Sequence, residues 1–345
     1  MSDDFTANLS QEEKKRGFKK VCLRLGLMMI AVFVSRGAAS VILALLSPSL
    51  ARLDADTAYV IESAISFVFL YIIPISVAIP LLKPKKMCAE VYKKPQYFGA
   101  AMGMFPAFYG LAIFANLLTI LITSLLSDTN INESLNTVNE LSPSGLTSAI
   151  VLLVQLTVIA PIFEEFWFRG IVMQALRPYG NGFAIFVSAL LFGLTHANFS
   201  QLFYTAVIGI CLGYIAVSTK SIVTTTIMHA ILNGISGVML LLLSSDSAQK
   251  YLLGKGGDSD PAVIAMLVYM FFVIIFMLVG IIMAIFKLRK LRRYRVEKMW
   301  DYSAVRRWGI FLSRVTVIVM LILAADTLTF RYITTAVYKV VTGQL

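Results

Sequence analysis

Residues 146–176 read LTSAIVLLVQLTVIAPIFEEFWFRGIVMQAL. The stretch is long enough to cross the about 30 Å of hydrocarbon in a bilayer, and its charges are confined to Glu164, Glu165 and Arg169. Ionisable side chains at membrane depth are costly and usually face a partner or a water-filled cavity. We therefore predict a transmembrane helix that carries two carboxylates into a buried polar site.

Eight other apolar segments accompany this stretch. The chain has 345 residues, of which 58% are hydrophobic and 14% charged, so it has more apolar surface than a soluble core can hide. We expect an all-α, polytopic transmembrane helical bundle that forms a single membrane domain over 1–345. Besides 146–176, the expected helices span 25–48, 59–82, 97–126, 183–197, 201–218, 222–244, 261–286 and 309–328.

Basic residues predict the orientation. With a cytoplasmic N-terminus, most of the 30 lysines and arginines fall in inside segments, which is the usual positive-inside asymmetry. We therefore expect an integral multi-pass protein of a bacterial cell membrane, with its N-terminus cytoplasmic and its C-terminus outside. The run from Lys287 to Arg293 predicts contact with anionic lipid headgroups. The sequence has no nucleic-acid-binding motif, so we expect no nucleic acid partner.

Both histidines of the chain lie in apolar segments. Counting about 1.5 Å of helix rise per residue from the expected cytoplasmic ends puts Glu164, His196 and Asn233 at roughly 18, 20 and 17 Å, and His229 at roughly 11 Å. Three helices are thus predicted to bring polar groups to nearly the same depth. A shared depth with a carboxylate favours a functional site over two unrelated packing histidines.

Four-residue spacings place side chains on one helix face. Glu165 and Arg169 are therefore expected to form an ion pair, which leaves Glu164 to face the cavity. Phe192 precedes His196 by the same interval and is expected to wall one side of the pocket. Pro161, one turn before the glutamates, is expected to kink its helix, because proline lacks the backbone donor.

These groups suit the hydrolysis of an acyl bond by activated water. Glu164 is the expected general base, and His196 can share the water or pass a proton to the leaving amine. His229 and Asn233 are four residues apart and can donate hydrogen bonds to a developing oxyanion. The candidate catalytic residues are therefore Glu164, His196, His229 and Asn233, with Glu165, Arg169 and Phe192 in supporting roles.

Three short motifs occur in order on separate predicted helices: EEFWFR at 164–169, FGLTH at 192–196 and HAILN at 229–233. This series resembles the E-E-x-x-x-R, F-x-x-x-H and H-x-x-x-N/D motifs of the CPBP family. That family joins type II CAAX prenyl endopeptidases to bacteriocin-processing and Abi proteins. The resemblance implies a catalytic helical core at 146–244, with flanking transmembrane helices at 1–145 and 245–345.

The resemblance also implies residue roles. Glu164 would activate water with His196 beside it, His229 and Asn233 would stabilise the oxyanion, and Glu165 and Arg169 would hold the helix in place. Metal use stays open at this point. Glu164, His196 and His229 could bind zinc, but H-E-x-x-H is absent and the resemblance also implies a mechanism without a protein-bound metal. We expect no cofactor, with zinc as the alternative.

The expected function is an intramembrane endopeptidase. It would cut peptide bonds near the C-terminus or leader of hydrophobic or lipid-modified peptides, with its site open to the cytosolic side. The alternative is a non-catalytic membrane protein, either an Abi-type immunity and binding protein or a scaffold for a sensor.

Two other functional classes, a rhomboid protease and a proton-relay transporter, fit the sequence less well. Gly234 to Gly237 matches the nucleophile motif of rhomboid proteases, but both histidines precede Ser236, the reverse of the rhomboid order. A proton-relay transporter could use Glu62, Arg36, Arg314 or Asp326. Arg36 is instead expected to make an interhelical contact, and no inverted repeat of broken helices is visible.

Small residues predict close helix packing. Segments 183–197 and 201–218 are expected to form a tight hairpin, in which Gly209 and Gly213 allow the backbones to approach. Gly99 and Gly103 have the same spacing and lead to the same expectation for the third helix.

Overall fold

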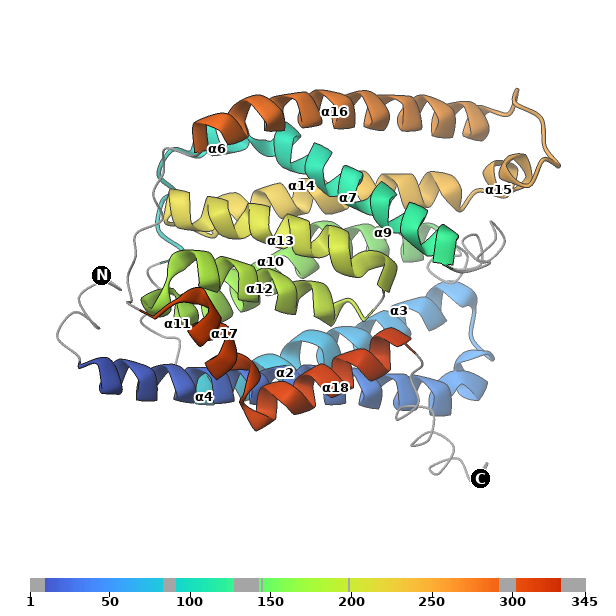
Figure 1. The fold of residues 1–345 in the computed structure, drawn as a ribbon. Helices are drawn as coiled ribbons and strands as arrows, with labels where there is room; N and C mark the ends of the chain where they lie inside the picture. The colour runs from blue at the N-terminus through green and yellow to red at the C-terminus, as the bar shows by residue number, and fades with distance from the viewer. Residues whose placement is uncertain are drawn as a thin grey trace.

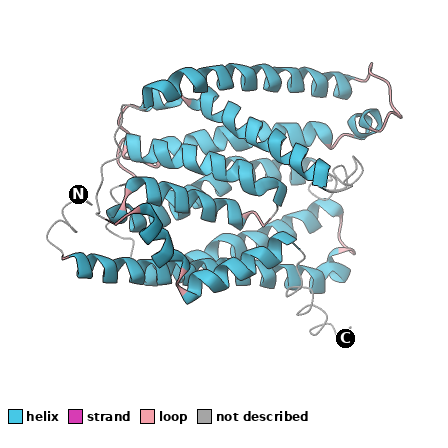
Figure 2. Ribbon diagram, viewed as in Figure 1, coloured by secondary structure: helices cyan, strands magenta, loops and turns pink. Residues whose placement is uncertain are grey.

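The computed structural model describes residues 10–82, 91–126, 143, 145–197, 199–291 and 302–329. These residues form helices joined by short turns and contain no strand (Figure 2). The expected all-helical fold is confirmed. In chain order the helices are α2 (Gln11–Leu50), α3 (Ala55–Phe67), η1 (Val68–Ile72), α4 (Ile73–Leu82), α6 (Phe98–Met102), α7 (Phe105–Leu126), α9 (Leu146–Val154), η2 (Gln155–Ile159), α10 (Ala160–Glu165), η3 (Phe166–Val172), α11 (Met173–Leu176), η4 (Arg177–Tyr179), α12 (Asn181–Thr195), α13 (Phe199–Thr219), α14 (Val223–Leu243), α15 (Asp246–Leu252), α16 (Pro261–Leu291), α17 (Ala304–Leu312) and α18 (Val315–Thr329).

Seven helices of the described chain are long and apolar enough to cross a membrane. An eighth span results if α17 and α18, which meet at 77°, are counted as one broken crossing. The expected segment 183–197 corresponds to α12, whose 15 residues rise only about 22 Å and fall short of the hydrocarbon thickness. The protein is an integral membrane protein in which α12 is shorter than a full crossing.

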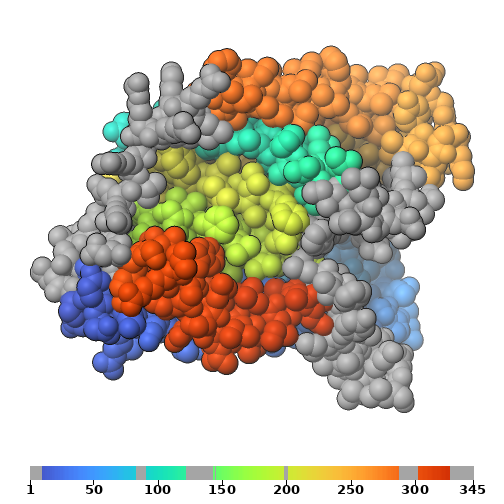
Figure 3. All heavy atoms as spheres, in the orientation of Figure 1, coloured from blue at the N-terminus to red at the C-terminus, as the bar shows by residue number. Residues whose placement is uncertain are grey.

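The helices form layers around a central group (Figure 1). This group consists of the continuous helical segment α9–α11 together with α12, α13 and α14. On one side α2 packs against α4 and α18, and on the other side α7 packs against α13 and α16. The space-filling view shows α17 and α18 lying over α2, with α7 and α16 at the opposite edge (Figure 3). The central helices are thus covered from both sides.

The helix that carries the glutamates is not a regular α-helix. It changes to a π-helical turn at η2, returns to α-helix in α10, and becomes π-helical again in η3. Pro161 has no N–H to donate to the preceding turn, and the η2 turn directly before it closes with an Ala160 N–H to Gln155 carbonyl bond. The distortion expected at Pro161 therefore takes the form of a π turn, a feature often found at functional sites.

Close glycine contacts join α12 to α13, as predicted for Gly209 and Gly213. A Cβ added at Gly209 would lie 2.8 Å from the Ala189 Cα, and one at Gly213 would lie 3.1 Å from the Ile185 side chain. Both distances are shorter than ordinary van der Waals contacts, so a larger residue at Gly209 would push the two backbones apart. The expected hairpin of α12 and α13 is confirmed.

The corresponding expectation for Gly99 and Gly103 is wrong. No described atom lies within 4 Å of a Cβ built at Gly99, and the nearest atoms to one built at Gly103 are carbonyls of its own turn. Gly99 lies in the five-residue helix α6, and Gly103 is its C-cap. Close approach in this region occurs instead between Gly110 of α7 and Gly280 of α16.

Candidate active site

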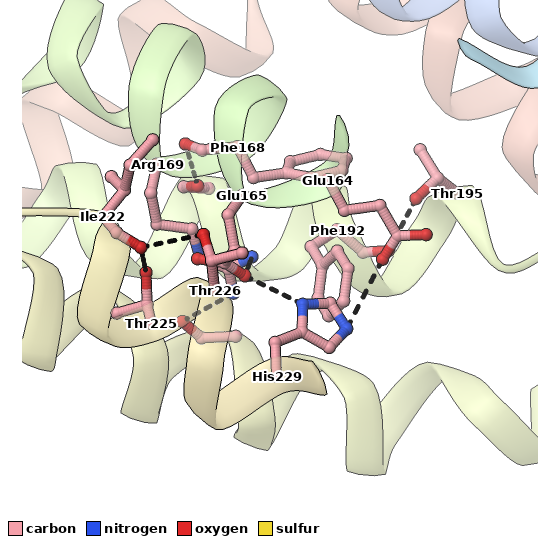
Figure 4. Close-up of polar contacts among 12 residues, drawn as sticks. Glu164, Glu165, Phe168, Arg169, Phe192, Thr195, Ile222, Thr225, Thr226 and His229 are labelled. Atoms are coloured by element: carbon pink, nitrogen blue, oxygen red, sulfur yellow. Dashed lines mark hydrogen bonds and ion pairs between the residues drawn. The ribbon is translucent and has the colours of Figure 1, made fainter. Parts of the chain in front are cut away.

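The three motif segments meet inside the bundle. Glu164 and Glu165 end α10, Arg169 lies in η3, His196 follows the last residue of α12, and His229 is in the first half of α14. Figure 4 shows Glu164, Glu165 and His229 pointing toward one another, with Arg169 behind Glu165. Helices that are distant in sequence therefore bring these polar groups together.

Glu165 and Arg169 form the expected ion pair. Arg169 Nη1 donates to Glu165 Oε1 at 2.7 Å, and Arg169 Nη2 donates to the Gly209 carbonyl at 3.3 Å. The side chains of Glu165 and Arg169 are 0% and 1% exposed. A buried charge needs a partner of opposite charge, so this pair neutralises Glu165 and also ties η3 to α13.

His229 lies between the two carboxylates. Its Nδ1 is 3.0 Å from Glu165 Oε1, and its Nε2 is 3.6 Å from Glu164 Oε2. An ionised carboxylate can only accept a hydrogen bond, so pairing with Arg169 assigns the Nδ1 proton to His229 as the donor to Glu165. The neutral ring then carries its lone pair on Nε2, which faces Glu164.

Glu164 differs from its neighbour in exposure. Its side chain keeps 18% of its surface accessible, whereas that of Glu165 keeps none. The Tyr71 hydroxyl, from η1, donates to Glu164 Oε1 at 2.9 Å. Glu164 is therefore the carboxylate of the pair that a small molecule such as water can reach.

Phe192 contacts both histidines. Its ring lies edge-on to His196 with centroids 4.9 Å apart and edge-on to His229 at 5.8 Å, and the Arg169 Cζ is 4.7 Å from its centroid. His196 Nδ1 donates to the Phe192 carbonyl at 3.0 Å, so neutral His196 carries its lone pair on Nε2. Electrostatic interactions link His196 to Glu164 and His229.

Asn233 contacts a different turn of the helix from the one that carries the glutamates. Its Nδ2 donates to the Leu156 carbonyl in η2 at 2.9 Å, whereas His229, one turn earlier in α14, contacts Glu164. The depth estimate from the sequence, which put Asn233 rather than His229 level with Glu164, is therefore wrong. It assumed uniform helix rise and aligned helix ends, but η2 and η3 are π-helical and the helices pack with their own offsets.

Glu164, His196 and His229 are the residues named above as possible zinc ligands. Within the described residues no group of three or more His, Cys, Asp or Glu side chains could hold a metal ion. His229 uses Nδ1 on Glu165 and His196 uses Nδ1 on a backbone carbonyl. Both rings thus keep Nε2 for a proton or another partner.

Sequence reasoning missed Tyr71. A single tyrosine in the apolar run FVFLYIIP, residues 67–74, was a usable signal, because buried tyrosine hydroxyls usually find a hydrogen-bond partner. Arg36 was expected to make an interhelical contact, and this is confirmed: its Nη1 donates to the Thr195 carbonyl of α12 at 2.8 Å.

Residues 146–235 match the family model of the type II CAAX prenyl endopeptidase Rce1-like proteins. Over this segment the match supports membership of the CPBP family. The matched CPBP segment runs from the start of α9 into α14 and contains all three motifs. Tyr71 and Arg36 precede this CPBP segment. Neither a curated protein nor a solved structure matched the chain.

Proposed function

We propose that this protein is an intramembrane endopeptidase in which Glu164 activates water. It would hydrolyse peptide bonds near the C-terminus or leader of hydrophobic or lipid-modified peptides. The proposal rests mainly on the different environments of two adjacent carboxylates. Glu165 is buried and neutralised by Arg169, whereas Glu164 remains partly exposed beside His229. Two carboxyl groups in different environments are typical of sites that divide structural and chemical roles.

The chemical step follows from these positions. Glu164 takes a proton from water as the water oxygen bonds to the scissile carbonyl carbon. Collapse of the tetrahedral intermediate breaks the C–N bond, and the proton passes to the leaving amine. His196, with its Nδ1 proton held by the Phe192 carbonyl, can accept or return a proton through Nε2.

His229 and Asn233 are the proposed oxyanion donors. Because Nδ1 of His229 carries the proton directed at Glu165, Nε2 can donate only when the ring is an imidazolium. Asn233 uses one amide hydrogen on Leu156 and has a second one to offer. Both donors would act where negative charge develops.

The reaction proposed here uses no metal. It needs a base, a proton carrier and oxyanion donors, all of which the chain provides as side chains. Retention of cleavage after rigorous chelation is the expected result, and tightly bound stoichiometric zinc would contradict it. We propose that the N-terminus is cytoplasmic and that substrates enter from the cytosolic side. Anionic lipids would contact the basic segment 287–293, of which residues 292 and 293 lie outside the described residues.

The test is a cleavage assay with purified protein on a prenylated CAAX peptide and on hydrophobic leader peptides. Glu164→Gln keeps size and hydrogen bonding but removes the base, so the rate is expected to fall by about 100-fold to 10,000-fold, the usual contribution of a general base. Glu62→Gln, an exposed carboxyl in α3, is the matched control and should retain the parental rate.

Two results would contradict the proposal. Equal cleavage by the parent protein and Glu164→Gln would identify a contaminant. Peptide binding without cleavage, unchanged by Glu164→Gln, would support the immunity and binding alternative instead.

A further inference from the structure

Two polar side chains from helices that precede the family segment reach the candidate site. Tyr71 donates to Glu164 across 93 positions of sequence, and Arg36 donates to the Thr195 carbonyl across 159 positions. Thr195 directly precedes His196. Each contact therefore ends on, or next to, one of the residues proposed to handle the proton.

The Tyr71 ring is held by aromatic packing. Its centroid lies 5.8 Å from that of Phe67 and 5.4 Å from that of Phe163, and these two rings are 5.2 Å apart. Phe163 directly precedes Glu164, so the cluster links η1 to the turn that carries the base. Tyrosine has few side-chain torsions, and a packed ring leaves its hydroxyl little freedom. The hydroxyl thus fixes Oε1 of Glu164 in one place.

Arg36 acts at the end of α12. The last carbonyls of a helix have no intrahelical donor, and here the Arg36 guanidinium supplies one to Thr195. A cation at this helix end also complements its dipole. His196 is the C-cap residue, and Ala197 after it has a positive φ of 50°, a conformation that is uncommon for a residue with a side chain. The Arg36 contact restrains the turn in which His196 lies.

The two side chains belong to one connected unit. Ser35, next to Arg36, donates its hydroxyl to the Phe69 carbonyl in η1, the π-helical turn that contains Tyr71. A shift of α2 against η1 would therefore disturb both the Glu164 and the His196 contacts.

We propose that Tyr71 and Arg36 are positioning residues of the hydrolytic site. Tyr71 occupies one oxygen of Glu164 so that the other receives the proton of water, and Arg36 holds the end of α12 and with it His196. The proposal rests on the proposed function. It extends the functional unit from the family segment to the first two membrane helices.

Tyr71→Phe keeps the packed ring and removes only the hydroxyl. We expect kcat to fall by about tenfold to a hundredfold, the range for losing one hydrogen bond to a charged group, with KM for the cleaved peptide unchanged. Tyr269→Phe is the matched control, since it removes a hydroxyl that donates to the Ile235 carbonyl at 2.8 Å elsewhere in the membrane region. It should retain the parental kcat.

Arg36→Gln should also lower kcat and leave KM unchanged. Arg36→Lys keeps a charged donor and should therefore have a kcat between those of Arg36→Gln and the parent. Melting in detergent is measured for every variant. Two results would overturn the inference while the proposed function stands. One is a Tyr71→Phe protein with the parental kcat. The other is a loss of kcat that follows a lower melting temperature and is accompanied by a changed KM. A parent protein without Glu164-dependent cleavage would overturn both.

Discussion

Two adjacent glutamates occupy different environments, and this difference is the main feature of the site at the scale of single residues. Glu165 accepts hydrogen bonds from Arg169 and His229 and is completely buried. Glu164 accepts from Tyr71 and keeps part of its surface exposed. A buried, paired carboxylate is suited to holding structure, whereas a partly exposed neighbour can exchange protons with water.

Replacing Arg169 with Met should therefore damage the fold rather than the chemistry alone. The Glu165 carboxylate would stay buried without its cation, a change that typically costs about 3–5 kcal/mol. Unfolding in detergent micelles measures the loss. Glu164→Gln should unfold close to the parent, and Glu165→Leu combined with Arg169→Met should lose less than the sum of the single changes. Equal stability of Arg169→Met and the parent would show that the pair is not needed for folding.

At the scale of elements, two π-helical turns and one close helix pair set the geometry. The η2 and η3 turns bracket α10, so the side chains after each turn are rotated relative to a regular α-helix. The α12–α13 pair is close because Gly209 has no side chain, and the Gly209 carbonyl accepts from Arg169. The packing of α13 is thus coupled to the ion pair beneath the candidate base.

Gly209→Ala should destabilise the protein by about 1–3 kcal/mol, the usual cost of overpacking, because its Cβ would lie 2.8 Å from the Ala189 Cα. Gly99→Ala is the control, since no described atom lies within 4 Å of its Cβ. Denaturant unfolding in micelles compares the two. A Gly209→Ala protein as stable as Gly99→Ala would mean that α12 and α13 separate at little cost.

At the scale of the whole molecule, the family segment is enclosed by helices from both ends of the chain. α2 and α18 cover one side, and α7 and α16 cover the other. The α2 and η1 helices contribute Arg36 and Tyr71 to the site. The flanking helices therefore do more than anchor the central group in the membrane.

The positive-inside asymmetry predicts that the loop at Lys94 faces the cytoplasm and the loop at Asp258 faces outward. Both residues are exposed. In a protein whose own cysteines are replaced by serine, an impermeant thiol reagent on intact cells should label Asp258→Cys and not Lys94→Cys. Permeabilised cells should show labelling at both sites. The opposite pattern in intact cells would reverse the proposed orientation and the side from which substrates enter.

The sequence alone determined the fold class and part of the site. Long apolar segments specify membrane helices because the bilayer sets their length, and the four-residue spacing of Glu165 and Arg169 specifies their ion pair because it follows the helix period. Tertiary structure decided that His229 lies between the two glutamates and that Tyr71 and Arg36 reach the site. Those contacts depend on how distant helices are offset and where π turns occur, and local periodicity contains neither.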